Sequence, residues 1–170
     1  MPCACRVPVP DYPANAAWGP LFWLILHGLA EKAGQGTLFG AGSGSDEVRE
    51  WQRFLKATGE TLPCDECRAH FQAYTLAHPL AYFAEIPYQS LKTAVKTWLW
   101  ELHNDIRTEY GHDPLPFDQL TPLYAGVNLQ DLLWRLEPVM KSAIHIKGMG
   151  GMKWQAWVKS FKMLRAILGV

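Results

Sequence analysis

Apolar residues recur at intervals of three and four in several windows of this 170-residue chain, and strict alternation of apolar and polar residues is missing. Intervals of three and four place side chains on one face of an α-helix, whereas alternation would indicate a half-buried strand. The clearest window covers residues 90–111. Its apolar face consists of Leu91, Val95, Trp98, Leu102 and Ile106. The pattern therefore predicts an all-α protein.

The same pattern divides the chain into a series of predicted helices. The predicted helices cover residues 16–33, 47–57, 64–78, 90–111, 129–143 and 153–168. Pro20 is compatible with the first turn of the first helix, and the Gly/Ser-rich stretch 34–46 indicates a flexible connection. The first helix is apolar almost all round, so we expect it at the centre of the fold. The first four helices, joined by short connections, predict a four-helix bundle.

The composition fits a single globular domain. Hydrophobic residues make up 49% of the sequence, enough to bury a core in a chain of this length, and this excludes a disordered protein. The eight tryptophans are compatible with a core or a cofactor pocket built from planar side chains. The N-terminal stretch MPCACRVPVPDYP lacks the apolar segment of a secretory signal, and the apolar run 21–26 is too short to span a membrane. We expect a soluble, cytoplasmic protein with no transmembrane segment.

Charge is distributed unevenly, although the formal net charge is zero. Residues 1–138 carry ten Lys/Arg and sixteen Asp/Glu, a balance of −6, whereas residues 139–170 carry six Lys/Arg and no acid, a balance of +6. A basic segment can attract nucleic acid, an anionic membrane or an acidic partner. On an amphipathic helix such charges more often form a solvated face, and we expect no nucleic-acid binding.

The four cysteines form two close pairs, CxC at Cys3 and Cys5 and CxxC at Cys64 and Cys67. Such pairs close very small loops, so they suit redox exchange or metal binding better than they suit structural stapling. The CxxC stands at the start of a predicted helix, where free backbone N–H groups favour a thiolate. A disulfide formed there opens and closes easily, because the second cysteine can resolve a mixed disulfide.

A zinc site is the alternative interpretation of this segment, LPCDECRAHF. Cys64, Cys67 and His70 lie on one side of the predicted helix, and a fourth ligand could come from Cys3 or Cys5. In that case the protein would be a non-enzymatic helical binding module. No second downstream ligand pair of a standard structural zinc site is present, but the spacing by itself leaves both interpretations open.

The surrounding residues shift the balance towards redox chemistry. Trp23 and His27 share one face of the first predicted helix, and Trp98 and the pair His103-Asn104 occur in the fourth. Together with the CxxC they offer flat surfaces for stacking and hydrogen-bond donors for a polar ring. This combination suits a redox-active planar cofactor inside a helical bundle.

These residues resemble the flavin-dependent sulfhydryl oxidases of the Erv/ALR type. The matching pieces are Gly19-x3-Trp23-x3-His27-x2-Ala30, LPCDECRAHF, WLWELHNDI at 98–106, and Gly111. Their order and spacing agree with the family, and the joint pattern is far more specific than a CxxC. The segment WGPLFW most resembles the compact viral members of the family. A viral origin would place the protein in the host-cell cytoplasm or the virion. The resemblance does not extend over the last fifty or so residues.

The resemblance implies a four-helix bundle with a short fifth helix that binds FAD, usually as a homodimer. It divides the chain into a flexible N-terminal arm with the CxC at 1–15, an FAD-binding domain at 16–117 and a helical C-terminal extension at 118–170. We expect the extension to pack on the bundle or across a dimer, although docking to an anionic membrane or a partner is also conceivable for its apolar and basic faces.

The resemblance also implies roles for individual residues. Cys64 would be the distal sulfur that meets incoming thiols, and Cys67 the sulfur next to the flavin. The FAD site would be lined by Gly19, Trp23, His27, His70, His103, Asn104, Arg107 and His112, with no metal. The substrates would be protein or small dithiols together with dioxygen, which is converted to hydrogen peroxide.

Four positions depart from the family pattern. Arg107 stands where the family has the second Asn of its HNxVN motif, and His112 stands where a Lys usually follows the Gly. Both changes affect the adenosine and phosphate end of FAD, where Arg107 could supply the lost positive charge. Ala33 replaces a common Tyr near the cofactor. Trp100 occupies one position of an extra structural disulfide found in many members, so the bundle has to hold by packing.

The CxC at the N-terminus resembles the second dithiol that family members often carry on a flexible arm. A disulfide between Cys3 and Cys5 would close a strained small ring, which should be reduced or passed on readily. We therefore expect this pair to be a candidate shuttle that relays electrons to the CxxC, the alternative being an incidental exposed pair.

Overall fold

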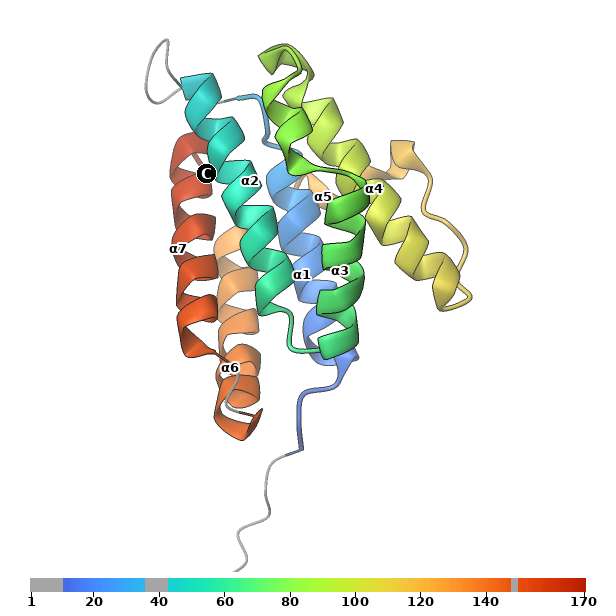
Figure 1. The fold of residues 1–170 in the computed structure, drawn as a ribbon, viewed down its shortest axis with the longest axis vertical. Helices are drawn as coiled ribbons and strands as arrows, with labels where there is room; N and C mark the ends of the chain where they lie inside the picture. The colour runs from blue at the N-terminus through green and yellow to red at the C-terminus, as the bar shows by residue number, and fades with distance from the viewer. Residues whose placement is uncertain (1–10, 36–42, 148–149) are drawn as a thin grey trace, which may run out of the picture.

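The computed structural model of the protein describes residues 11–35, 43–147 and 150–170, and Figure 1 shows its fold. Within these ranges the structure is helical and contains no strand, which confirms the prediction of an all-α fold. The α-helices are α1 (Asn15–Ala30), α2 (Ser43–Thr61), α3 (Asp65–Ala77), α4 (Leu91–Glu109), α5 (Leu120–Tyr124), α6 (Leu129–Lys147) and α7 (Gly151–Leu168). Short 3₁₀-helices η2 (Leu80–Ala84), η3 (Tyr88–Ser90) and η4 (Phe117–Gln119) lie in the connections.

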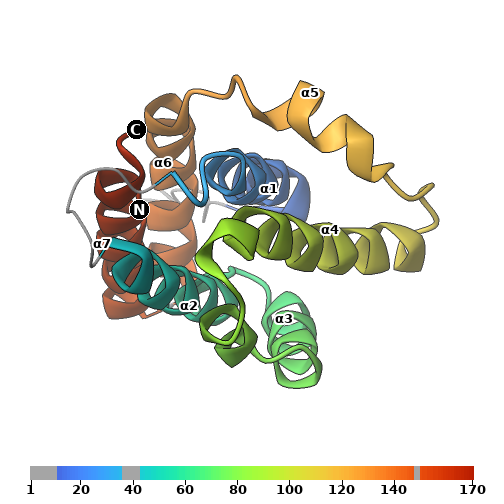
Figure 2. The same cartoon turned by 90° about the horizontal axis from the view of Figure 1, so that it is seen from above.

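Helices α1 and α2 lie in the middle of the molecule. Helix α1 packs against α4, α5 and α6, and α2 packs against α3 and α7, an arrangement that Figure 2 shows from above. The C-terminal half of α1 is buried on all sides, from Ile25 to Ala30. A helix that is apolar all round is stable only when it is enclosed, so its sequence dictates this central position.

The ends of the first two helices differ from the predicted ones. Helix α1 ends at Ala30, and the chain turns at Gly34, which has a φ of +73° that only glycine adopts without strain. The backbone N–H of Gly34 donates to Oε1 of the buried Glu47, a bond that ties this turn to α2. Helix α2 begins earlier than predicted, because residues 43–46 continue it and Asp46 pairs with Arg49 one turn later.

The C-terminal extension packs on the bundle. Trp157 on α7 lies edge-on against Phe22 of α1, with ring centroids 5.2 Å apart, and 5.4 Å from the ring of Phe54 on α2. Its indole Nε1 donates to Oγ1 of Thr58, and Phe161 stacks on it at 5.6 Å. Helices α6 and α7 therefore cover apolar faces of α1 and α2 and complete the core.

A buried ion pair connects the other side of α1 to its neighbours. The carboxylate of Glu31, just past the end of α1, is buried and lies 2.5 Å from Nζ of Lys96 on α4. Thr121 on α5 donates to the same carboxylate and accepts a hydrogen bond from Lys96. A buried charge needs such partners, so these contacts fix α1, α4 and α5 relative to one another.

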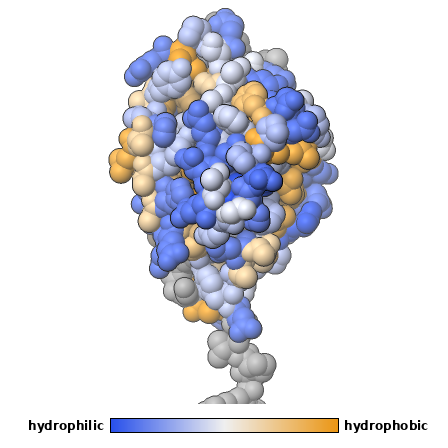
Figure 3. Space-filling model, turned by 90° about the vertical axis from the view of Figure 1, so that its right-hand side faces the viewer, coloured by the Kyte–Doolittle hydropathy of each residue, from blue (hydrophilic) through white to orange (hydrophobic). Residues whose placement is uncertain are grey.

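The outer surface carries mostly polar side chains. Figure 3 shows the side that lies to the right in Figure 1, which is mainly hydrophilic with apolar residues in small patches near its edges. No helix in the described parts of the chain combines the length and the apolar character needed to cross a membrane.

Gly28 provides the first test of this packing. A Cβ at this position of α1 would lie 2.4 Å from Cγ2 of Val127 and 3.2 Å from Cδ2 of Leu129. We expect Gly28→Ala to lower the free energy of unfolding by about 1–3 kcal/mol, because added volume in a packed contact forces neighbours apart. Chemical denaturation measures the change.

The matched control is Gly126→Ala, since a Cβ there would meet no atom within 4 Å. The control should be nearly neutral, and Val127→Ala should restore part of the stability lost in the Gly28 variant. An unchanged midpoint for Gly28→Ala would contradict this description of the contact.

Candidate functional site

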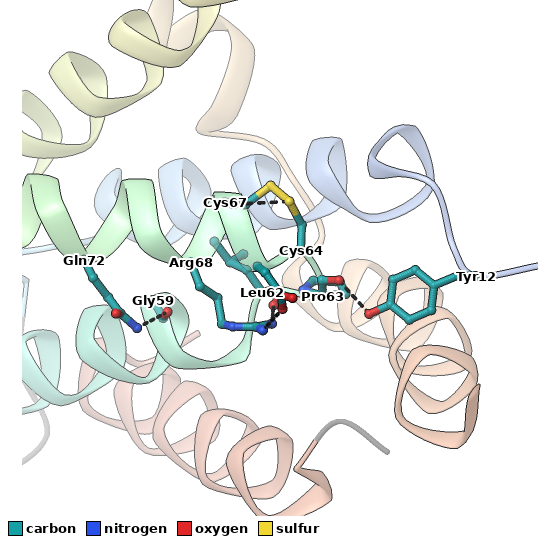
Figure 4. A network of polar contacts seen from close by, with 9 residues as sticks. Tyr12, Gly59, Leu62, Pro63, Cys64, Cys67, Arg68 and Gln72 are labelled. Atoms are coloured by element: carbon teal, nitrogen blue, oxygen red, sulfur yellow. Dashed lines mark hydrogen bonds and ion pairs between the residues drawn. A yellow bond between two sulfur atoms is a disulfide. The ribbon is translucent and has the colours of Figure 1, made fainter. Parts of the chain in front are cut away.

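Cys64 and Cys67 form a disulfide at the start of α3, with their Cα atoms 5.1 Å apart. Cys64 is the N-cap of this helix, and its Sγ accepts a hydrogen bond from the backbone N–H of Cys67 at 3.2 Å (Figure 4). Pro63 directly precedes the motif, and the backbone of Cys64 is extended, with φ −126° and ψ 126°, before the helix begins. Both sulfur-bearing residues are half-buried, so the bridge lies at the boundary between core and solvent.

Side chains on both sides hold the segment before the disulfide. The hydroxyl of Tyr12 donates to the carbonyl oxygen of Pro63 at 2.5 Å, and the guanidinium of Arg68 donates to that of Leu62 (Figure 4). Further along α3, Nε2 of Gln72 donates to the carbonyl oxygen of Gly59 on α2. The bridge is thus supported by the chain that precedes α1, by α2 and by α3 itself.

Cys67 borders a cavity of about 250 Å³ between α1, α2, α3 and α4. Its lining is apolar and aromatic, and the aromatic members are Trp18, Phe22, Trp23, Phe71 and Tyr110. Whole ligands usually occupy pockets of about 300–1,000 Å³, so this cavity is suited to one flat ring system and not to an entire dinucleotide. Gly19 also lines it, and a Cβ there would meet nothing within 4 Å.

Trp18, one of the lining residues, is buried and carries an unpaired hydrogen-bond donor. Among the described residues, none accepts a bond from its indole Nε1. A buried donor without a partner costs about 1–3 kcal/mol. A ligand with an acceptor near this ring could remove that cost, so the lining fits a polar aromatic group.

A stack of rings continues from the cavity through Trp23. The rings of Trp23 on α1 and His103 on α4 lie parallel with centroids 3.9 Å apart. His27 on α1 lies beside His103, with Nε2 3.0 Å from Nδ1 of His103, and the His27 ring also stacks on Tyr124 of α5, with centroids 4.5 Å apart. The structure therefore brings together three of the predicted site residues and adds Tyr124.

Both histidines of this stack are neutral at physiological pH. Burial lowers the pKa of His27 to about 3, and the neighbouring His103 and Lys96 act in the same direction. Burial also lowers the pKa of His103 to about 4, and the nearby positive charge of Arg107 contributes. In a neutral pair one ring donates and the other accepts, which matches their 3.0 Å separation.

The remaining predicted residues lie towards the end of α4. Nδ1 of His70 lies 3.1 Å from a carboxylate oxygen of Glu109, and His70 does not line the cavity. Asn104 makes two hydrogen bonds with the backbone of Leu115. Nε of Arg107 donates to the carbonyl oxygen of Asp113, and His112 is exposed on the same turn. Cys3 and Cys5 lie outside the described residues.

The family model described as Erv1 / Alr family matches residues 21–122, more than half of the chain. The chain belongs to the Erv1 / Alr family. Neither the comparison with curated proteins nor that with solved structures gave a match. Members of this family are generally FAD-binding flavoproteins. Membership therefore supports an oxidoreductase function of the sulfhydryl-oxidase type.

Zinc binding at this motif is not favoured. The two sulfurs are bonded to each other, and His70 is paired with Glu109. Within the described ranges, no group of three His, Cys, Asp or Glu side chains is arranged to hold a metal ion. A redox role for the CxxC agrees with the Erv1 / Alr family and with the disulfide.

The departures from the Erv/ALR pattern have structural counterparts. Trp100, at a position of the disulfide found in other members, donates from Nε1 to the carbonyl oxygen of Leu115 and packs edge-on against Phe117. Together with the bonds of Asn104 and Arg107, these contacts attach the segment after α4 to that helix. Ala33 is fully buried.

Sequence reasoning missed many residues of this region, among them four that carry hydrogen-bonding groups. Asn15, Trp18 and Thr58 line the cavity, and Tyr124 completes the ring stack. Trp18 lies inside the WGPLFW segment that resembles the family, so the sequence could have indicated it as a site residue. The other three give no local signal, because their positions depend on how α1, α2 and α5 cross.

The neutral histidine pair predicts a pH dependence of stability. Both pKa values in the folded chain lie below the unfolded value of about 6.5, so the unfolded chain binds more protons between these values. The contribution is present above about pH 6.5 and is lost as the pH falls. Each histidine should contribute a little over about 1 kcal/mol, so we expect the free energy of unfolding to drop by about 2–3 kcal/mol between about pH 7.5 and about pH 5.5.

Denaturation curves at several pH values measure this slope, and His103→Gln should reduce it. The control is His145→Gln on the exposed side of α6, which should leave the slope unchanged. A slope that is the same in all three proteins would show that the pair is not its source.

Proposed function

We propose that this chain is an FAD-dependent sulfhydryl oxidase. It forms disulfides in dithiol or protein substrates and passes the electrons through the Cys64–Cys67 disulfide and FAD to dioxygen, giving hydrogen peroxide. The observation that carries the proposal is that Cys67 of the CxxC borders an aromatic cavity sized for a flat ring. The match to the Erv1 / Alr family supports it independently.

The residues present fit FAD in two adjoining regions. The cavity offers the Cys67 sulfur, flat apolar walls, the open position at Gly19 and the unpaired N–H of Trp18. Trp23 connects this cavity to the ring stack. Bound FAD would accept two electrons from the dithiol and deliver them to dioxygen.

The polar residues beyond Trp23 would hold the rest of the dinucleotide. His27 and His103 offer neutral rings, and the guanidinium of Arg107 is close enough to lower the pKa of His103. Arg107 would supply the positive charge for the phosphates that the family obtains from other residues. His70, Asn104 and His112 complete the proposed FAD-binding set.

The two sulfurs have different surroundings that suit different tasks. Cys67 lines the cavity, whereas Cys64 does not. A substrate thiolate would attack Sγ of Cys64, form a mixed disulfide and release Cys67 as a thiolate beside the cavity. The second substrate thiol then attacks the substrate sulfur, and Cys64 leaves as a thiol. The substrate dithiol is oxidised and the Cys64–Cys67 pair is reduced.

The position of Tyr12 supports the shuttle proposed for Cys3 and Cys5. Its hydroxyl is bonded to the carbonyl oxygen of Pro63, the residue next to Cys64. Seven Cα–Cα steps separate Cys5 from this anchor and span at most about 25 Å when extended, which is ample for the CxC to meet the CxxC. The arm therefore starts at the site that it would serve.

The division of the chain at residue 117 and the homodimer also remain proposals. Tyr124 of the extension stacks on His27, so the extension contributes to the proposed FAD site. Helices α6 and α7 cover apolar faces of α1 and α2. A second copy would therefore have to dock on other surfaces.

Replacement of Cys67 tests the assignment of the sulfurs. Cys67→Ser should leave the purified protein yellow, with a flavin absorption band, because the remaining walls of the cavity are unchanged. Oxygen consumption with dithiothreitol should fall at least about a hundredfold, since an enzyme that loses its covalent redox group loses that route altogether. An oxygen electrode and an absorption spectrum make the measurements.

A colourless wild-type protein would overturn the proposed cofactor. A yellow Cys67→Ser protein that retains full turnover would show that another sulfur passes electrons to the flavin. Gly126→Ala serves as a handling control, because a Cβ at that position would meet no atom within 4 Å.

The shuttle has a test of its own. Cys3→Ser/Cys5→Ser should leave turnover with dithiothreitol unchanged, because a small dithiol reaches Cys64 directly. Turnover with a reduced protein substrate should fall several-fold, since the arm would no longer carry electrons to the CxxC. Equal turnover of both substrates in the variant and the parent protein would identify the CxC as an incidental pair.

A further inference from the structure

The N-terminus of α1 lies against the sulfur of Cys67. Asn15 is the first residue of this helix, and its side-chain Nδ2 donates to Sγ of Cys67 at 3.8 Å. The N-cap residue Ala14 has no side chain that could cap the helix, and the first turn contains no acid. The partial positive charge of this helix end is therefore not neutralised by its own side chains.

In the described part of the structure, Cys64 meets the N-terminus of α3 alone, where its Sγ accepts a hydrogen bond from the backbone N–H of Cys67. It caps α3, and the first turn of α3 carries the two acids Asp65 and Glu66. Their negative charges oppose the favourable effect of the helix end on a Cys64 thiolate, although Asp65 is paired with Arg68. Both sulfurs share the acidic first turn of α3, but Cys67 also contacts the acid-free N-terminus of a second helix, α1.

The other groups around Cys67 leave this contrast intact. Of the residues that the structure describes, no Asp, Glu, Lys, Arg or His lines the cavity that it borders, and the titratable residue in the lining besides Cys67 is Tyr110, just after α4. On α3 the titratable side chains within three residues of Cys67 are Asp65, Glu66, Arg68 and His70. Asp65 is paired with Arg68, and His70 with Glu109 of α4. Thr58 of α2 and Leu62, just after α2, also line the cavity and carry no charge.

We propose that Asn15, together with the N-terminus of α1, stabilises the thiolate of Cys67 when the disulfide opens, and that this directs incoming thiols to Cys64. Attack of a substrate thiolate on Sγ of Cys64 forms one S–S bond and breaks the Cys64–Cys67 bond. The electron pair of the broken bond leaves on Cys67. A sulfur whose thiolate is stabilised leaves faster, so Asn15 acts as a catalytic residue at the reacting atom.

The use of this contact in thiol oxidation rests on the proposed function, but its electrostatic effect does not. The experiment therefore follows Cys67 itself, in the full-length chain with Cys3, Cys5 and Cys64 replaced by Ser. The rate of alkylation by iodoacetamide is measured against pH, because the thiolate is the reactive form. Circular dichroism checks that each variant is folded.

Asn15→Asp in this background should raise the pH at half-maximal alkylation by about one unit and slow alkylation at neutral pH about tenfold, because it places a like charge beside the thiolate. Asn15→Ala should produce a smaller rise, because it only removes the donor. Asn15→Ser should produce the smallest rise, because its hydroxyl can still donate to the thiolate. The matched control is Ala16→Asp, which adds the same charge to the same turn from an exposed position. Its rise should be less than half as large.

Equal profiles for Asn15→Asp and the parent, or equal rises for Asn15→Asp and Ala16→Asp, would overturn the inference. If the protein is yellow and active but the Asn15 substitutions do not change the alkylation profile, this inference is wrong and the proposed function is retained. If the protein is colourless but the Asn15 substitutions shift the alkylation profile as expected, the proposed function is wrong and this inference is retained.

Discussion

Enclosure of α1 is the constraint on which the rest of the structure depends. This one helix supplies Gly19 and Trp23 to the cavity, His27 to the ring stack and Asn15 to the sulfur of Cys67. Each of these positions is useful only because α1 is held in place by α4, α5 and α6. A helix with so much apolar surface would aggregate if it were left exposed, so the same burial that stabilises the fold also fixes the geometry of the site.

A negative charge lies at each end of α1 once the disulfide has opened. The helix dipole stabilises the one at the N-terminus and destabilises the one at the C-terminus. At the N-terminus, the positive end meets a sulfur that becomes an anion. At the C-terminus, the carboxylate of Glu31 stands at the negative end, where it is unfavourable on its own. Lys96 and Lys92 on α4 offset this cost by pairing with it. The ion pair thus secures the helix at the end away from the disulfide.

Local patterns predicted the parts of the site that lie within one helix. The interval from Trp23 to His27 and the CxxC at the start of α3 are short-range features, and the structure has both where the sequence placed them. The contact between Asn15 and Cys67 joins residues 52 positions apart, and no local pattern contains that information. Tyr124 belongs to a five-residue helix, which is too short to give a periodic signal. The start of α2 was missed because glycine and serine usually indicate a connection.

The C-terminal extension shows how a region outside the family pattern can still shape the site. Its apolar stripe predicted that it packs on the bundle or across a dimer, but the sequence could not identify which surface it covers. In the structure, Trp157 contacts Phe22 and donates to Thr58, and both of these residues line the cavity beside Cys67. The wall of the cavity on α1 and α2 is therefore backed by α7. Because a packed interior transmits small displacements, the width of the cavity depends on a helix that the Erv1 / Alr match does not reach.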